Sequence, residues 1–172
     1  QLCLLTYSWW HPVSHQLNME AYEKWLKKAG GRNIITLWLY VYGADHDAAY
    51  HFGGYKPFPE LYPWKMGEYM KRFAKDGIRG CFLEARMPTC FVETYVAAKL
   101  CYNPSLDSAK ILDEYFTEYY GEAGPAMKKF YKEVEDACFS PSACPPEWLK
   151  DSNVVMGPKG PKHPFWATGL WS

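Results

Sequence analysis

Residues 33–45 have the sequence NIITLWLYVYGAD, which alternates as a β-strand does and carries different side chains on its two faces. Successive side chains of a strand point to opposite faces of the sheet. The aliphatic positions therefore share one face, and Trp38, Tyr40 and Tyr42 share the other. The aliphatic face suits packing under helices. The row of rings that leads to Asp45 suits either a buried core or a surface that stacks on a sugar.

Extended and helical patterns alternate along the first half of the chain. Residues 2–9 are predicted to form a strand, and Asn18 is predicted to cap a helix that stops at Gly30. A second helix over about residues 65–76 leads to a strand over residues 78–85. This order of strand, helix, strand, helix and strand predicts parallel βαβ units. The apolar stripe of the first helix is expected to consist of Tyr22, Trp25, Leu26 and Ala29.

The second half is predicted to be helical and then extended. Helices are expected over residues 92–100, from a cap at Ser105 or Asp107 to Tyr120, and over residues 125–138. Three parallel strands cannot close a barrel, which needs roughly 250 residues. We therefore predict an α/β fold: the C-terminal portion of a TIM (β/α)8 barrel in residues 1–90, followed by a helical C-terminal extension in residues 91–139. Residues 140–172 are rich in proline and glycine and are expected to form an extended tail or linker.

Composition limits the class of protein. The 172 residues suffice for one domain with a sizeable core. The 19 acidic and 19 basic residues balance to a formal charge of zero without runs of like charge, which argues against nucleic acid or an anionic membrane surface as a partner. No apolar run reaches the length of a membrane span. Aromatic residues make up 18% of the chain, which fits either a packed core or a binding cleft.

The six cysteines show no pattern of metal ligands. They lack a CxxC pair and a Cys/His spacing typical of zinc, and no spacing places two histidines on one helical face, so we expect no metal and no cofactor. Cys3 and Cys81 fall in predicted apolar strands and are expected in the core. Cys138 and Cys144 are close enough in sequence to form a disulfide, which a secreted location would permit.

Four stretches of the chain carry a family resemblance. They are LYVYG at residues 39–43, FPELYPW at 58–64, GIRGCFLEA at 77–85 and the run over residues 95–131. Together they resemble the DUF4838 family, whose members are bacterial proteins related to α-glucuronidases and β-hexosaminidases, over roughly residues 4–137. The most specific part is the order of Tyr95, Lys99-Leu100, Asn103-Pro104 and YYGEA at residues 119–123.

This resemblance implies a glycosidase-like TIM barrel in an exported protein, located outside the cell, in the periplasm or at the cell surface. In related glycosidases the principal catalytic acids often lie on a middle strand of the barrel, which this chain is expected to lack. The chain also opens directly in a strand-like run at Gln1. We therefore expect a missing N-terminal part of the same protein to be a partner and to supply at least one catalytic carboxyl group.

Candidate site residues lie at the predicted carboxyl ends of the strands, where the active sites of such barrels are found. Glu84 is the first candidate, because it shares a strand face with Phe82 and lies opposite Leu83, which is expected to pack on helices. Its carboxylate could accept hydrogen bonds from sugar hydroxyls or act in an acid/base pair; the alternative is a salt bridge to Arg86. Asp45 is the second candidate carboxylate, or a turn cap. The expected substrate-binding residues are Trp9, Trp10, Trp38, Tyr40, Tyr42 and Arg86.

These residues lead to an expected function with open alternatives. Glycosidic hydrolysis usually uses two carboxyl groups, about 5–5.5 Å apart for retention and about 6.5–9.5 Å apart for inversion. We expect a carbohydrate-active protein with a glycoside hydrolase-like domain that binds or cleaves an oligosaccharide or polysaccharide. One alternative is a carbohydrate-binding or surface protein that keeps the barrel without the catalytic acids. Another is a helical structural module whose rings form only core.

Overall fold

The computed structural model describes residues 1–6, 9, 12–31, 34–41, 61–85 and 90–140. Strands and helices alternate through β3, and helices follow it. The elements are β1 (Leu2–Leu4), α1 (Pro12–Ala29), β2 (Thr36–Val41), α3 (Pro63–Lys75), β3 (Gly80–Ala85), α4 (Phe91–Tyr102), α5 (Ser108–Tyr120), the short 3-10 helix η2 (Gly121–Ala123) and α6 (Gly124–Cys138). The chain is thus a mixed α/β protein, as the sequence predicts.

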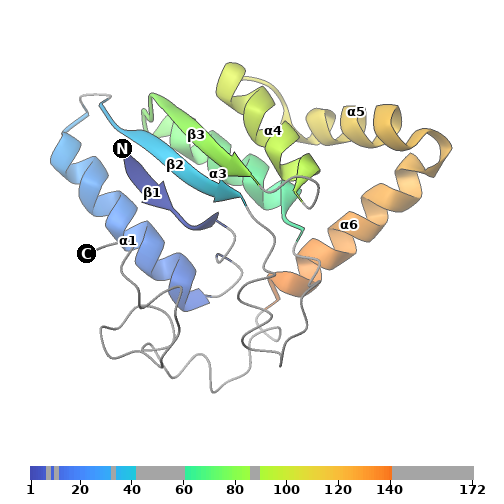
Figure 1. Ribbon diagram of the computed structural model, residues 1–172, viewed down its shortest axis with the longest axis horizontal. Helices are drawn as coiled ribbons and strands as arrows, with labels where there is room; N and C mark the ends of the chain where they lie inside the picture. Colours follow the sequence, from blue (N-terminus) through green and yellow to red (C-terminus); the bar gives the residue numbers. More distant parts are fainter. Residues whose placement is uncertain (7–8, 10–11, 32–33, 42–60, 86–89, 141–172) are drawn as a thin grey trace.

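The three strands form one parallel sheet in the order β1-β2-β3 (Figure 1). Leu39 of β2 is in register with Leu4 of β1 and with Leu83 of β3. Parallel neighbours need a long crossover connection, and a helix lies within each of the two connections here. The predicted parallel βαβ units are therefore confirmed.

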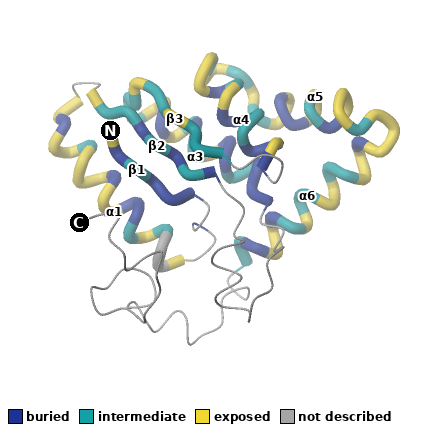
Figure 2. The backbone as a smooth tube through the Cα atoms, viewed as in Figure 1, coloured by how far each residue is buried: buried dark blue, intermediate teal, exposed yellow. Residues whose placement is uncertain are grey.

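The aliphatic face of β2 is the centre of the core. Leu37, Leu39 and Val41 are fully buried, whereas Trp38 and Tyr40 between them are only partly covered. The same core contains Tyr22 of α1, side chains of α3 such as Phe73, and side chains of α4. In Figure 1 the sheet lies in front of α3, and α1 runs beside β1. Helices α1, α3 and α4 thus cover one face of the sheet, and Figure 2 shows how burial alternates along the strands.

Two details of the first helix differ from the prediction. Helix α1 starts at Pro12, where the fixed φ of proline suits a first helical turn, so Asn18 lies inside the helix and does not cap it. The Asn18 side chain is buried, and its Oδ1 accepts a hydrogen bond from the backbone N–H of Leu5 at 3.1 Å. Trp25, predicted to belong to the apolar stripe, is 50% exposed. Strand β1 is also shorter than the predicted strand over residues 2–9.

Helices α5 and α6 form a V that projects away from the sheet (Figure 1). Gly121 lies at the turn between them with a φ of 54°, a backbone conformation that favours glycine. A Cβ at Gly124 would lie 2.6 Å from the backbone oxygen of Phe116, so the two helices approach very closely there. Glycine is required at both positions for the chain to reverse within a few residues.

Removal of the cap of α5 is the first testable prediction. Asp107 is the N-cap residue, and its Oδ1 accepts a hydrogen bond from the backbone N–H of Ala109 at 2.8 Å. Asp107→Ala is expected to lower the free energy of unfolding by about 1 kcal/mol, because it leaves that N–H without its acceptor. Asp107→Ser, which keeps an acceptor, is the control and should lose much less. Equal losses in the two variants, measured by urea denaturation, would contradict the capping role.

Candidate functional site

The face of the sheet opposite the helices carries a row of aromatic rings. Trp38 is in register with Phe82, and Tyr40 is in register with Glu84, so these four side chains share one face. The ring centroids of Trp38 and Phe82 are 4.9 Å apart at an interplanar angle of 71°, and those of Trp38 and Tyr40 are 5.9 Å apart at 23°. The Phe82 side chain is 51% exposed. We call this set of four residues the open sheet face.

Glu84 is held in place by the central ring of this face. The indole Nε1 of Trp38 donates a hydrogen bond to Oε2 of Glu84 over 2.8 Å. Burial, together with the nearby Glu84 carboxylate, raises the pKa of Tyr40, so its hydroxyl keeps its proton at neutral pH. The face therefore offers ring surfaces, a hydroxyl donor and a carboxylate acceptor in one place. Such a set can stack on a flat ligand and bind its hydroxyl groups.

The structure brings together Glu84, Trp38 and Tyr40 of the predicted site. Trp10, Tyr42, Asp45 and Arg86 lie outside the described residues, so their predicted roles stay predictions. Phe82 has the same strand parity as Glu84 but was not among the predicted binding residues. That parity, shared with Glu84, was the signal that could have identified it.

Two residues of the first strand region lie elsewhere than expected. Trp9, predicted to bind substrate, is 2% exposed, and its ring centroid lies 4.3 Å from that of Tyr69 on α3. It therefore packs in the helical layer and does not belong to the open sheet face. Cys3, predicted to be a core residue, is only partly buried and in register with Trp38, which places it on the face of the rings.

Two buried carboxyl groups that were not predicted from the sequence lie at the start of α3. The N-cap residue Tyr62 makes no side-chain cap, so the first N–H groups of the helix need acceptors from elsewhere. Glu93 of α4 accepts from the Tyr62 N–H at 2.8 Å, and Glu135 of α6 accepts from the Trp64 N–H at 2.8 Å. Burial raises the pKa of each carboxyl to about 7, against the partial compensation of these hydrogen bonds.

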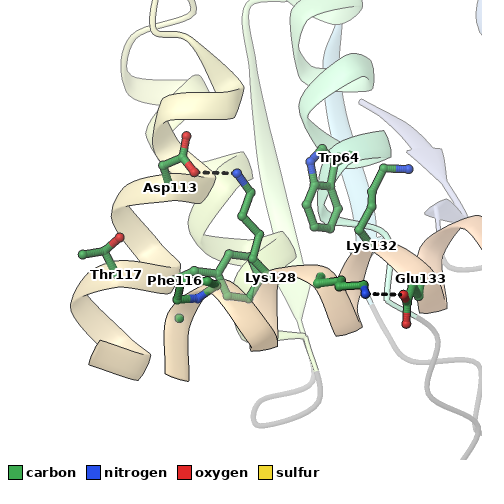
Figure 3. Close-up of a pocket in the computed structure, with 10 residues that line it drawn as sticks. Trp64, Asp113, Phe116, Thr117, Lys128, Lys132 and Glu133 are labelled. Atoms are coloured by element: carbon green, nitrogen blue, oxygen red, sulfur yellow. Dashed lines mark hydrogen bonds and ion pairs between the residues drawn. The ribbon is translucent and has the colours of Figure 1, made fainter. Parts of the chain in front are cut away.

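A separate hollow of about 550 Å³ lies between α5, α6 and the start of α3 (Figure 3). Trp64 lies at this hollow beside Lys128 and Lys132, and its ring stacks on that of Phe116 with centroids 6.3 Å apart. Each charged side chain that lines the hollow already has a partner of opposite charge: the pairs are Lys128–Asp113, Lys129–Glu133 and Lys132–Asp136. These pairs already neutralise the charges of the hollow, so it is a weaker candidate site than the open sheet face.

Metal and membrane features can be assessed only for the described part of the chain. Within it, no group of three or more histidine, cysteine, aspartate or glutamate side chains could hold a metal ion. None of the described helices combines the length and the apolar character that crossing a bilayer requires. Cys144, which is close enough in sequence to Cys138 to form a disulfide with it, lies outside the described ranges, so this pairing stays open.

The geometry defines an α/β protein whose sheet carries aromatic rings on its open face. Comparison with known proteins adds the family of the chain. The model of the family described as Domain of unknown function (DUF4838) matches residues 1–132. The chain belongs to this family, and the predicted resemblance is confirmed at that level. No curated protein and no solved structure matches the chain.

Proposed function

We propose that the open sheet face binds carbohydrate and that the chain forms the C-terminal portion of a glycoside hydrolase-like TIM barrel. The observation that carries the proposal is the hydrogen bond of 2.8 Å between Trp38 and Glu84, set among the rings of Tyr40 and Phe82. The flat, weakly polar faces of sugars stack on aromatic rings, while their hydroxyl groups bond to carboxylates and phenols. A parallel sheet with helices on one face agrees with a segment of such a barrel, whose other strand face lines the interior.

Cleavage of a glycosidic bond would require more than this face offers. Hydrolysis usually takes two carboxyl groups. Among the described residues of the open sheet face, Glu84 is the one carboxylate, and the Trp38 indole fixes one of its oxygens. This arrangement favours binding of hydroxyl groups over proton transfer by Glu84. In a catalytic version, Asp45 or preceding sequence of the same protein would supply the second carboxyl group.

A carbohydrate-binding protein without catalysis is therefore the second candidate function. The single described carboxylate on the face and its fixed orientation favour it. The export implied by the family resemblance, to the outside of the cell, the periplasm or the cell surface, is part of both proposals. The two are separated by assay of the full-length protein on 4-nitrophenyl glycosides and uronides, because only the enzyme releases nitrophenol.

Removal of the central ring tests the binding proposal. Isothermal titration calorimetry of the full chain with chitohexaose and with a glucuronic acid-substituted xylo-oligosaccharide measures the affinity of each. Trp38→Ala is expected to weaken binding about tenfold or more, because it removes both the stacking surface and the donor to Glu84. Trp25→Ala, which removes a 50% exposed tryptophan on α1, is the matched control and should leave affinity unchanged.

A second variant separates the contribution of the Glu84 carboxylate to binding from that of the Trp38 ring. Glu84→Gln keeps the shape of the side chain but replaces one acceptor oxygen by a donor group. It is expected to weaken binding while the unfolding midpoint stays close to that of the wild type. Absence of binding to either oligosaccharide by the wild type, or equal losses in the Trp38 and Trp25 variants, would overturn the proposal for these ligands.

A further inference from the structure

Two thiols from different elements lie at one hollow behind the sheet. Cys81 of β3 alternates with Phe82 and Glu84 and so lies on the helix side of the strand, and Cys101 lies in the last turn of α4. Both line one hollow of about 180 Å³. The Cys81 and Cys101 thiols interact with each other through a side-chain hydrogen bond. The hollow thus brings together one thiol from the strand and one from the end of the helix.

The two sulfurs differ in protonation and in access. The hydrogen bond with Cys81 lowers the pKa of Cys101, against the opposing effect of burial. The same hydrogen bond, together with burial, raises the pKa of Cys81. Cys101 is exposed, whereas Cys81 is partly buried. An accessible thiolate beside a second, protonated thiol is the arrangement typical of cysteines that react with oxidants and are then resolved by a neighbour.

We propose that Cys81 and Cys101 form a redox-active dithiol, which small disulfides such as glutathione disulfide convert to an intramolecular disulfide. In the first step the Cys101 thiolate attacks one sulfur of glutathione disulfide, forms a mixed disulfide and releases one glutathione thiolate. In the second step Cys81 loses its proton to the solvent and its sulfur attacks Sγ of Cys101, which releases the second glutathione. The two protein thiols are oxidised, and one glutathione disulfide is reduced to two glutathiones.

The bond would join β3 to the end of α4. Cys81 directly precedes Phe82 of the open sheet face, so the bond would fix the strand that carries Phe82 and Glu84. An oxidising compartment would favour the closed form, and reduced thioredoxin-like systems would favour the open one. The inference goes beyond the carbohydrate proposal and does not depend on it, because it rests on a different face of β3.

Oxidation of the full, reduced chain by glutathione disulfide tests the proposal. The expected result is a loss of two hydrogen masses in the wild type, with Cys81 and Cys101 found in linked peptides after proteolysis. Cys81→Ser is expected to retain one glutathione at Cys101, because nothing resolves the mixed disulfide. Cys101→Ser is expected to form neither the intramolecular disulfide nor a mixed disulfide with glutathione at Cys81. Cys3→Ser, which changes a thiol on the other face, is the control and should oxidise as the wild type does.

The pH dependence of alkylation tests the hydrogen bond itself. The rate at which iodoacetamide modifies Cys101 in the wild type is expected to reach half of its maximum at a lower pH than is usual for a cysteine thiol. Cys81→Ala removes the thiol donor and should move that midpoint upward, so that the rate at pH 7 falls roughly tenfold. Cys81→Ser supplies a hydroxyl donor and should restore part of the rate. A stable mixed disulfide in the wild type, or the same midpoint in the wild type and in Cys81→Ala, would overturn the proposal.

Discussion

Phe116→Ala is expected to lower the free energy of unfolding by about 3–5 kcal/mol, the usual cost of removing a fully buried aromatic side chain. Phe116 of α5 is 1% exposed. Its ring packs on Trp64 of α3, with centroids 6.3 Å apart, and on Tyr131 of α6, with centroids 5.2 Å apart. The side chain therefore joins three helices, and the cavity left by alanine lies where none of them can close it alone.

Urea denaturation of the full chain, followed by circular dichroism, measures this loss. Phe130→Ala is the matched control, because Phe130 lies on the neighbouring helix α6 and is 48% exposed. It should lose less than about 1 kcal/mol, as exposed substitutions usually do. A loss of similar size in both variants would mean that α5 does not pack on α3 and α6 through Phe116.

The part of the fold that the sequence predicts is the part that local geometry controls. Alternation along β2 follows from the pleat of a strand, so it correctly separates the buried Leu39 from the partly covered Trp38. The same parity places Glu84 with the rings. The turn at Gly121 also follows from the chemistry of a single residue, and of the two caps predicted, Ser105 or Asp107, the structure uses Asp107.

The errors arise where distant contacts decide. Asn18 precedes an apolar stripe as a cap does, but its amide bonds to Leu5, thirteen positions earlier, and the helix starts before it. Trp9 ends the predicted strand, as a binding residue would, yet its ring packs on Tyr69 of α3. Amphipathic periodicity in α4 likewise cannot show that Glu93 caps another helix. None of these contacts has a signal within the local sequence.

The two buried carboxyl groups lead to the second large prediction, which concerns pH. Glu93 and Glu135 are 0% and 2% exposed, and Oε2 of Glu93 has no hydrogen-bond partner among the described residues. Burial raises the pKa of each from 4.5 to about 7. The folded state thus binds these protons more tightly than the unfolded state does. Their contribution to stability is fully present below pH 4.5 and is lost as the pH rises to about 7.

The groups around the pair do not reverse this sign. Lys65 of α3 and Lys132 of α6 lower the pKa of Glu135, but less than burial raises it. Glu135 in turn raises the pKa of Glu93, because two negative charges repel. The nearby tyrosines Tyr69, Tyr115 and Tyr131 have pKa values raised well above neutral and do not titrate in this range. Because the two charges interact, Glu93 and Glu135 are expected to titrate together in the folded protein, near their pKa of about 7.

Glu93→Gln and Glu135→Gln isolate the effect, since glutamine keeps an acceptor oxygen and cannot ionise. Relative to each variant, the wild type is expected to lose up to about 3 kcal/mol of unfolding free energy between pH 5 and pH 8. Urea denaturation at pH 5, 6, 7 and 8 measures the difference. His15 of α1, whose pKa is lowered by burial, pushes stability in the opposite direction with pH, but it is present in both proteins and cancels. Glu133→Gln, an exposed neighbour on α6, is the control. If the unfolding free energy of the wild type and of the Glu93 and Glu135 variants changes with pH in parallel, these two carboxyl groups do not cause the pH dependence of stability.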